Sequence, residues 1–178
     1  LEAAKLGAQM MVFTQKPIKE HGADFRAYQE QFQAHHARPA PPPLMAGMCV
    51  CNQDSARAKE LARKHIAGYL VTVMHHYELM GDHFKQAKGY EAYGEAVEML
   101  RDIGLEGMSE AYMEAQAYGT PEQVLEKLVS WREVIGPFDM IVAFRAAGIA
   151  YEDAENSMHL FAREVLPELR NWENAEAA

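Results

Sequence analysis

The chain has 178 residues, of which 49% are hydrophobic, and a formal net charge of -9 at pH 7. A chain of this length and composition can bury one core, so we expect a globular domain. Nucleic-acid binding requires clustered Lys and Arg that displace counterions, and no such stripe occurs in this acidic sequence. No apolar run approaches the roughly 20 residues that cross a bilayer. We therefore expect no nucleic-acid partner, no membrane span and a cytoplasmic location.

The first four residues have the character of an interior part of a helix, because no start methionine, capping residue or signal peptide precedes them. We therefore expect the natural N-terminus to lie further upstream. The only cysteines are Cys49 and Cys51. Two residues apart in an apolar run, they have a poor geometry for a mutual disulfide, so we expect buried thiols of a reducing compartment.

Three continuous apolar runs have the length of strands, and they lie at residues 9–14, 44–51 and 138–144. Runs without alternation are typical of buried strands in parallel sheets. The long segments between them allow the chain to return to the same end of a sheet. The runs therefore predict neighbouring parallel strands with helices on the outside.

Apolar residues at helical spacing predict helices over residues 23–36, over 58 to about 80, over 121–134 and over 151–170. The segment Asn52-Gln53-Asp54-Ser55 precedes the second helix, and its short polar side chains can cap that helix. The run Thr120-Pro121-Glu122-Gln123 has the hydroxyl, proline and amide of a capping box. Glycines divide residues 81–119, so we predict an insertion with short helical pieces at 95–102 and 109–117.

Three segments near the C-terminus occur in the order and spacing of a known family. They are GTPEQV at 119–124, GPFDMIV at 136–142 and SMHLFAREVLPEL at 157–169. This set resembles the C-terminal signature of the bacterial luciferase-like flavin-dependent monooxygenases. Residues 3–7, with the Met-rich run that follows them, are similar to the sixth barrel strand of that family and the helix that precedes it. Lys88-Gly89-Tyr90 is similar to a segment of the luciferase α-type chain, so the likeness extends over the whole sequence.

The resemblance implies an α/β fold: residues 1–178 as the C-terminal half of a luciferase-like (β/α)8 TIM barrel, with a helical insertion at 81–119. Such barrels contain about 250 residues or more, so the N-terminal half would be absent. The implied enzyme is a monooxygenase that uses dioxygen and reduced FMN, supplied by a flavin reductase, to oxidise a small organic substrate. F420 serves some branches and is the less favoured cofactor. We expect this part to be inactive alone and to pack against the N-terminal half of the same barrel. We also expect a homo- or hetero-oligomer.

In TIM barrels the working face lies at the carboxyl ends of the strands. Phe13, Thr14 and Gln15 close the first predicted strand, and the resemblance implies that they contact the flavin. Core packing is the alternative for Phe13, because apolar strand ends serve both purposes. The luciferase pattern has tryptophan where Thr14 stands, so the ring would have more room here.

Three further residues are candidates for contacts with the substrate. Arg145 follows the third predicted strand and either clamps an anion or pairs with Glu152 or Asp153. Lys88 and Tyr90 lie on the insertion, which we interpret as a lid, with a fixed insertion or a dimer contact as alternatives. Catalytic residues are not assigned, and no metal site is predicted, since neighbouring histidines on a helix point in different directions.

Two other functions are compatible with the composition. One is a catalytically silent half-barrel that acts as a structural or dimerisation module. The other is a helical binding protein in which the apolar runs are buried helix segments. The Gly-Thr-Pro-Glu motif followed by a strand argues against the second.

Overall fold

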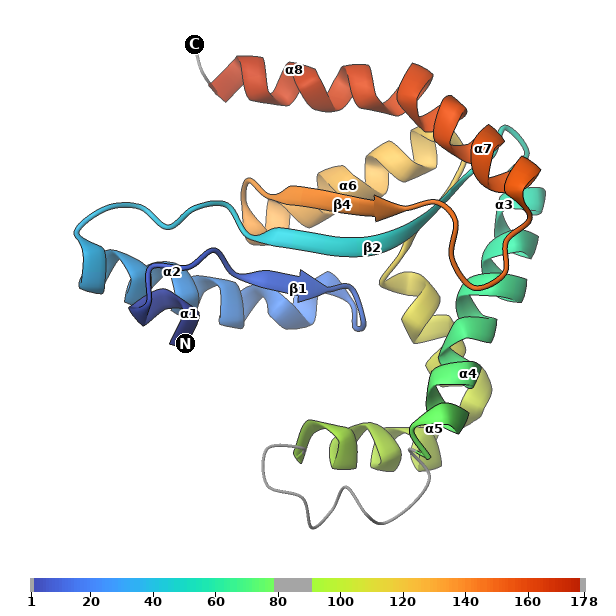
Figure 1. The fold of residues 1–178 in the computed structure, drawn as a ribbon, viewed down its shortest axis with the longest axis horizontal. Helices are drawn as coiled ribbons and strands as arrows, with labels where there is room; N and C mark the ends of the chain where they lie inside the picture. Colours follow the sequence, from blue (N-terminus) through green and yellow to red (C-terminus); the bar gives the residue numbers. More distant parts are fainter. Residues whose placement is uncertain (1, 79–90, 177–178) are drawn as a thin grey trace.

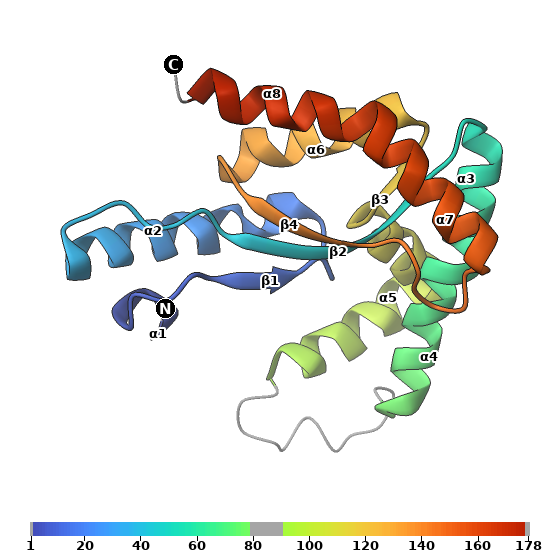
Figure 2. The ribbon, with the colours of Figure 1, turned by 45° about the horizontal axis from the view of Figure 1, so that its top comes forward.

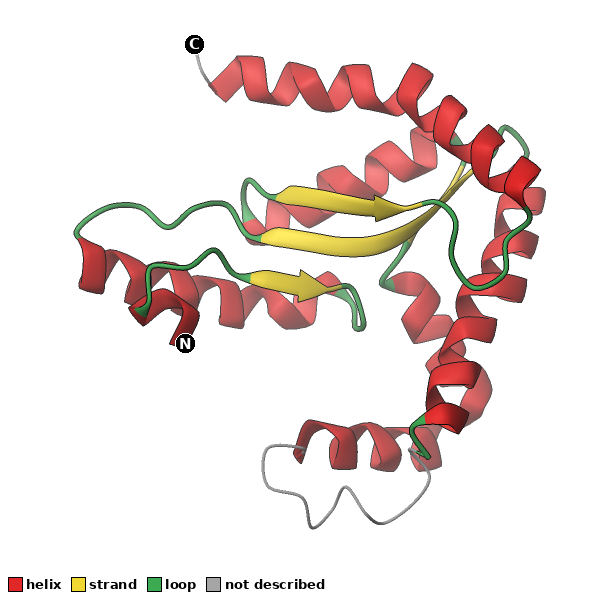
Figure 3. Ribbon diagram, in the orientation of Figure 1, coloured by secondary structure: helices red, strands yellow, loops and turns green. Residues whose placement is uncertain are grey.

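The computed structural model describes residues 2–78 and 91–176, which form a mixed α/β structure (Figure 1). The described strands are β1 (Met11–Phe13), β2 (Leu44–Cys51), β3 (Ala117–Gly119) and β4 (Asp139–Ala143). The helices, shown in red in Figure 3, are α1 (Glu2–Lys5), α2 (Gly22–His36), α3 (Ser55–Leu61), α4 (Gly68–His76), α5 (Glu91–Glu114), α6 (Pro121–Ile135), α7 (Tyr151–Leu160) and α8 (Leu166–Glu176). A 3-10 turn, η1 (Ile18–His21), precedes α2. The π-helical turns η2 (Ala62–Ala67) and η4 (Phe161–Val165) join α3 to α4 and α7 to α8.

All strand pairs are parallel, and β2 is the centre of the sheet. Leu44 is paired with Met11 of β1 and with Asp139 of β4, so these two strands lie on opposite edges of β2. The prediction of three neighbouring parallel strands is confirmed. The strands are shorter than the first and third apolar runs, because pairing ends where the chain leaves β2.

Strands β1 and β3 follow one another along the same edge of β2. The amide of Leu44 and the carbonyl of Ala46 bond to the β1 segment, and the amide of Asn52 bonds to the carbonyl of Gly119 in β3. Backbone groups of alternate residues in a strand face the same edge. The carbonyl of Pro43 instead accepts from the first residue of β4. In the β2 segment, the backbone N–H and C=O groups of even-numbered residues therefore face β1 and β3, and those of odd-numbered residues face β4.

Helices cover one face of the sheet, and in Figure 1 α2 and α6 lie behind the strands. The side chains of this core come from β2, α2, α6, α7 and η4. They include Phe25, Met45, Cys49, Val124, Leu128, Trp131, Phe161 and Val165. Met45, Cys49 and Cys51 are all odd-numbered, so the period of two of a strand points them to the helical side.

The opposite face of the sheet is largely bare in the described structure. Met11, Phe13 and Ile141 are 49%, 62% and 50% exposed. The prediction that all three apolar runs are buried is therefore wrong for one face of β1 and β4. The physical reason is that no described element packs over these side chains, although the residues have the apolar character of a covered strand.

A helical arm made of α3, η2, α4 and α5 lies at the end of the sheet toward which the strands point (Figures 1 and 2). Its core joins the end of β2 to the helices through Val50, Leu61, Ile66 and Met113. The predicted helix over 58 to about 80 is confirmed as far as His76.

The described part of the insertion contains two helical pieces divided by a glycine, as predicted, but with different bounds. Within Glu91–Glu114 the helix is broken by a kink at Gly104, whose φ of 71° is available to glycine at little cost, so the pieces do not end at 102 and begin at 109. A short strand, β3, follows it and was not predicted. The predicted 109–117 piece thus contains the end of a helix and the start of a strand.

Both predicted helix caps are present. The Asp54 carboxylate accepts from the amides of Ala56 and Arg57. At α6 the Thr120 hydroxyl accepts from the amide of Gln123, and the Gln123 side chain accepts from the amide of Thr120. These reciprocal bonds satisfy amides that lack an intrahelical partner, so they fix where α6 begins.

Candidate functional site

A hollow of about 230 Å³ lies between the end of β1, the middle of β2, β4 and the helical arm. It opens on the bare face of the sheet, toward the carboxyl end of β1. It is lined by Phe13, Thr14, Gln15, Ala46, Gly47, Met48, Tyr69, Tyr112, Gln116, Ile141 and Ala143. Carboxyl ends of parallel strands are where α/β folds bind ligands, so this is the candidate site.

None of the described lining residues carries a charged side chain. The rings of Tyr69 and Tyr112 are stacked, with centroids 6.4 Å apart and planes 28° apart. Burial, followed by the neighbouring Tyr69, raises the pKa of Tyr112 to about 12, so its phenol stays neutral. The hollow therefore suits an uncharged, flat group and offers nothing that neutralises a phosphate.

The three residues predicted to contact a flavin all line this hollow, but they differ in what they present. The Phe13 side chain is 62% exposed, whereas Thr14 is 3% exposed. The Thr14 hydroxyl lies 3.2 Å from the carbonyl oxygen of Ala46 and 3.0 Å from Oε1 of Gln116. Its single proton is therefore used inside the protein. The Gln15 side chain is exposed, and the main-chain amide of Gln15 donates to the carbonyl of Phe13 at 2.8 Å.

Arg145 lies apart from the lining of the hollow. Its guanidinium carbon is 3.8 Å from the ring centroid of Tyr151. Among the described contacts, neither Glu152 nor Asp153 pairs with Arg145. Asp153 instead pairs with Arg57 at 3.3 Å. The cation–π contact satisfies the charge of Arg145 at the surface. The expected Lys88 and Tyr90 positions lie outside the described residues.

Sequence patterns did not identify Tyr69, Tyr112 and Gln116 as lining residues. Tyr69 follows Ala62 and Ile66 at helical spacing, yet it is 40% exposed whereas both of those residues are buried. A helical period shows which residues share a face, but the π-turn η2 that precedes α4 changes the rotation of the faces. Gln116 carries no spacing pattern at all, and only its burial reveals it.

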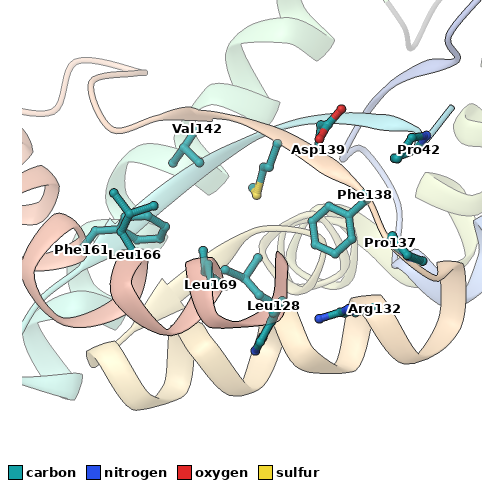
Figure 4. Close-up of a pocket in the computed structure, with 12 residues that line it drawn as sticks. Pro42, Leu128, Arg132, Pro137, Phe138, Asp139, Val142, Phe161, Leu166 and Leu169 are labelled. Carbon is teal, nitrogen blue, oxygen red and sulfur yellow. The ribbon is translucent and has the colours of Figure 1, made fainter. Parts of the chain in front are cut away.

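A larger groove of about 510 Å³ lies between α6, β4 and α8 (Figure 4). Apolar side chains such as Leu128, Phe138 and Leu169 line it, with Asp139 and Pro42 at one end. The β4 residues Met140 and Val142 line this groove, whereas Ile141 and Ala143 line the hollow. Because side chains alternate along a strand, the groove lies on the helical face of the sheet and the hollow on the bare face.

The buried thiols are unsuited to chemistry. Burial raises the pKa of Cys49 well above its ordinary value, and burial together with Glu164 and Glu122 raises the pKa of Cys51 to about 12. Both cysteines are free, as predicted. A thiol that stays protonated at neutral pH is a weak nucleophile and metal ligand. Within residues 2–78 and 91–176, no group of three or more potential ligands could hold a metal ion.

His21 provides a pH-dependent contribution to stability. Its Nε2 is buried without a hydrogen-bond partner, and burial, followed by Lys16, lowers the pKa of the ring. Because the folded pKa lies below the ordinary 6.5, this contribution is fully present above pH 6.5 and is lost as the pH falls through the folded value. We expect His21→Phe to weaken the decline of the melting temperature from pH 7 to about pH 5.

The control for this prediction is His159→Phe, since the His159 side chain is 67% exposed and its Nε2 lies 3.7 Å from Oε1 of Glu155. This variant should retain the decline seen in the unmodified chain. Equal pH dependence in the His21 variant and the unmodified chain would show that other groups cause the acid sensitivity.

Comparison with known proteins agrees with this architecture. The family described as luciferase-like monooxygenase matches residues 2–136. The chain belongs to the luciferase-like monooxygenase family. No protein of curated function matches the sequence significantly. In the described residues, no helix is both long and apolar enough to cross a membrane.

Solved structures of similar fold place the luciferase-like chain within a larger barrel. Monooxygenase RslO1 from Streptomyces bottropensis is 17% identical with a TM-score of 0.59, and the match covers 94% of this chain and 44% of that one. The oxygenating constituent of 3,6-diketocamphane monooxygenase from Pseudomonas putida, in complex with FMN, is 17% identical with a TM-score of 0.59, covering 93% and 44%. The F420-dependent tetrahydromethanopterin reductase from Methanopyrus kandleri is 17% identical with a TM-score of 0.51, covering 86% and 43%. The chain therefore spans less than half of these structures and forms a partial barrel.

Proposed function

We propose that this chain is the C-terminal part of an FMN-dependent luciferase-like monooxygenase that oxidises a small organic substrate with dioxygen. The observation that carries the proposal is the uncharged hollow at the carboxyl end of β1, in a chain of this family. Bound reduced FMN would supply the electrons that activate dioxygen. The residues of this chain would hold the ring and keep water away from it.

The chemistry of the lining supports the isoalloxazine ring as the group held here. Phe13 and Ile141 offer apolar contacts, and the Tyr69 and Tyr112 rings offer a flat aromatic wall. The phosphate of FMN needs cations or clustered amides, and the described lining has no cation. We therefore place the phosphate contacts in polypeptide that precedes this part of the barrel. F420 is the alternative cofactor, since one similar structure is F420-dependent.

The preceding half of the barrel is the proposed partner of the bare face. Met11, Phe13 and Ile141 are each at least about half exposed, and β1 and β4 are each paired only with β2 in the described sheet. Exposed apolar side chains and open strand edges favour association. We also propose that a flavin reductase supplies the reduced FMN, that the protein is cytoplasmic and that it assembles into an oligomer. In this proposal residues 1–178 form one half-barrel domain, with an insertion at 81–119.

FMN titration of two proteins tests the proposal. We expect the 178-residue chain alone to lack submicromolar affinity, because half of a barrel mouth buries too little of the ligand. The same chain joined to the preceding barrel half should bind FMN in a one-to-one ratio. Quenching of flavin fluorescence reports both. Submicromolar binding by the isolated chain, or no binding by the joined protein, would contradict the proposal.

The bare apolar face also supports a second candidate function. A catalytically silent module would use Met11, Phe13 and Ile141 to dimerise and complete its own core. Sedimentation equilibrium separates the two candidates. A stable dimer of the isolated chain that neither binds FMN nor joins a preceding half would favour the silent module.

Substitution of Tyr69 tests the aromatic wall of the hollow. Tyr69→Ala should raise the Kd for FMN of the joined protein by about 2- to 12-fold, since one stacking contact contributes about 0.5–1.5 kcal/mol. Tyr77→Ala is the matched control, because Tyr77 follows the same helix, is 55% exposed and lies outside the lining. Equal effects of the two substitutions would mean that Tyr69 does not contact the flavin.

A further inference from the structure

A buried side-chain amide occupies the gap between β1 and β3. Gln116 lies between α5 and β3, lines the hollow and is 1% exposed. Its Oε1 accepts from the amide of Met48 at 2.8 Å, and its Nε2 donates to the carbonyl of Thr14. Both ends of the amide are therefore bonded to the main chain of neighbouring strand segments.

The position of these bonds shows what the amide replaces. Along this edge of β2, the last main-chain bond to the β1 segment is at Ala46, and pairing with β3 begins at Cys49. The amide of Met48 faces the same edge, where an unbroken neighbouring strand would offer a main-chain carbonyl. Gln116 supplies that carbonyl from its side chain, so it acts as a piece of strand main chain. Among side chains only Gln and Asn carry such an amide, with donor and acceptor together.

The same contacts fix the end of β1. The Thr14 hydroxyl lies 3.0 Å from Oε1 of Gln116, and Gly47 lies directly beside it. A Cβ atom at Gly47 would be 2.5 Å from Oγ1 of Thr14, so a larger residue there would have to displace the hydroxyl. Phe13, the exposed apolar wall of the hollow, immediately precedes this fixed residue. The position of Phe13 thus depends on the bonds of Gln116 to Thr14.

We propose that Gln116 is a positioning residue for the flavin site. Its amide holds Thr14 at the end of β1 and so sets the position of Phe13 in the wall of the hollow. This inference rests on the proposed function, because it assumes that the hollow holds the ring. It goes beyond it by assigning a role to a residue that itself need not touch the ligand.

Gln116→Glu is the sharpest test, since it keeps the shape and removes the donor. Ionised, the carboxylate would face the carbonyl oxygen of Thr14 with no proton to donate. Protonated, the carboxyl group again has one donor and one acceptor. We expect the joined barrel with Gln116→Glu to bind FMN about 10-fold more weakly than the unmodified protein at about pH 8, since a buried acceptor loses its partner. The ratio of the Kd of the variant to that of the unmodified protein should approach one toward about pH 5, because burial favours the protonated acid.

Gln123→Glu is the matched control. Gln123 is exposed, and its Oε1 accepts from the amide of Thr120 and from the hydroxyl of Ser55, both at 3.0 Å. A carboxylate accepts as well as an amide oxygen, and Glu is favoured at this position of a capping box. The ratio of FMN affinities for this variant should stay near one at every pH.

Hydrogen exchange of the isolated chain provides a second measurement that needs no FMN. With Gln116→Glu, the main-chain amide of Thr14, which donates to the carbonyl of Ala46, should exchange faster at about pH 8 than at about pH 5, relative to the unmodified chain, because the end of β1 loses its bond at the Thr14 carbonyl. The amide of Met48 keeps an oxygen acceptor in either protonation state, so its exchange should change little. FMN affinity equal to that of the unmodified protein at all pH values would overturn the inference. So would a pH-independent loss that follows the folded fraction alone. If the unmodified barrel binds no FMN, the proposed function fails, and unchanged exchange at the Thr14 amide would then overturn the positioning role as well.

Discussion

Trp131→Ala is expected to lower the free energy of unfolding by about 3 to 5 kcal/mol, the range for removal of a buried large aromatic residue. Trp131 lies on α6 and is 2% exposed. Its ring packs against that of Phe138, with centroids 6.4 Å apart, in the core beneath the sheet. Truncation would leave a cavity between α6 and the strands, because the capped helix cannot collapse far onto the sheet.

Urea unfolding followed by circular dichroism measures this change. Trp172→Ala is the control, because Trp172 is only half-buried on α8 and stacks with the guanidinium of Arg132 at 5.0 Å. Trp172→Ala should lower the free energy of unfolding much less than Trp131→Ala. If the alanine variant does not fold at all, Trp131→Phe, with a smaller loss of volume, should still show a lower urea midpoint. Equal losses at both tryptophans would mean that the core is not organised around α6.

Local features of the fold could be predicted from the sequence because neighbouring residues determine them. The Thr120–Gln123 capping box needs four consecutive residues, and the structure contains both of its bonds. The β2 run is flanked by prolines and a capping Asp54, and its bounds are those predicted. Parallel pairing could be predicted because long segments separate the three runs, and parallel strands require such a connection, whereas a short hairpin joins antiparallel strands.

Features that depend on distant contacts could not be predicted in this way. Strand β3 has only three residues, and its pairing with β2 is what makes it a strand. The exposure of Phe13 depends on which elements cover the sheet, and an apolar run has the same pattern whether or not they are present. Burial of Gln116 is likewise a result of the tertiary fold, since glutamine is ordinarily an exposed residue.

The candidate site shows the same division at the level of single residues. The resemblance pointed to the end of β1, where Phe13, Thr14 and Gln15 line one hollow. It did not distinguish Phe13, which faces the hollow, from Thr14, whose hydroxyl is used to hold the strand end. That distinction comes from the hydrogen bonds to Ala46 and Gln116, which belong to segments 32 and 102 residues away.

Gly47→Ala is expected to disturb both the fold and the proposed flavin site. The new methyl group would lie 2.5 Å from Oγ1 of Thr14, which is a β-branched side chain with little freedom to move. Overpacking of this kind costs about 1 to 3 kcal/mol of stability. Because Thr14 is bonded to Gln116 and follows Phe13, the displacement would also move Phe13 in the wall of the hollow. We expect the Kd for FMN of the joined barrel to rise by about 10-fold or more, equivalent to about 1.4 kcal/mol.

Gly68→Ala provides the comparison that isolates the collision. Gly68 lies at the start of α4 with a φ of -59°, and a Cβ there would meet nothing within 4 Å. Alanine should therefore stabilise the helix by up to about 1 kcal/mol and leave the affinity for FMN unchanged. Thermal unfolding and flavin titration of both variants measure the two effects. If Gly47→Ala keeps full affinity while losing stability, the end of β1 does not set the geometry of the site, and the hollow must bind its ligand through Tyr69 and the helical arm alone.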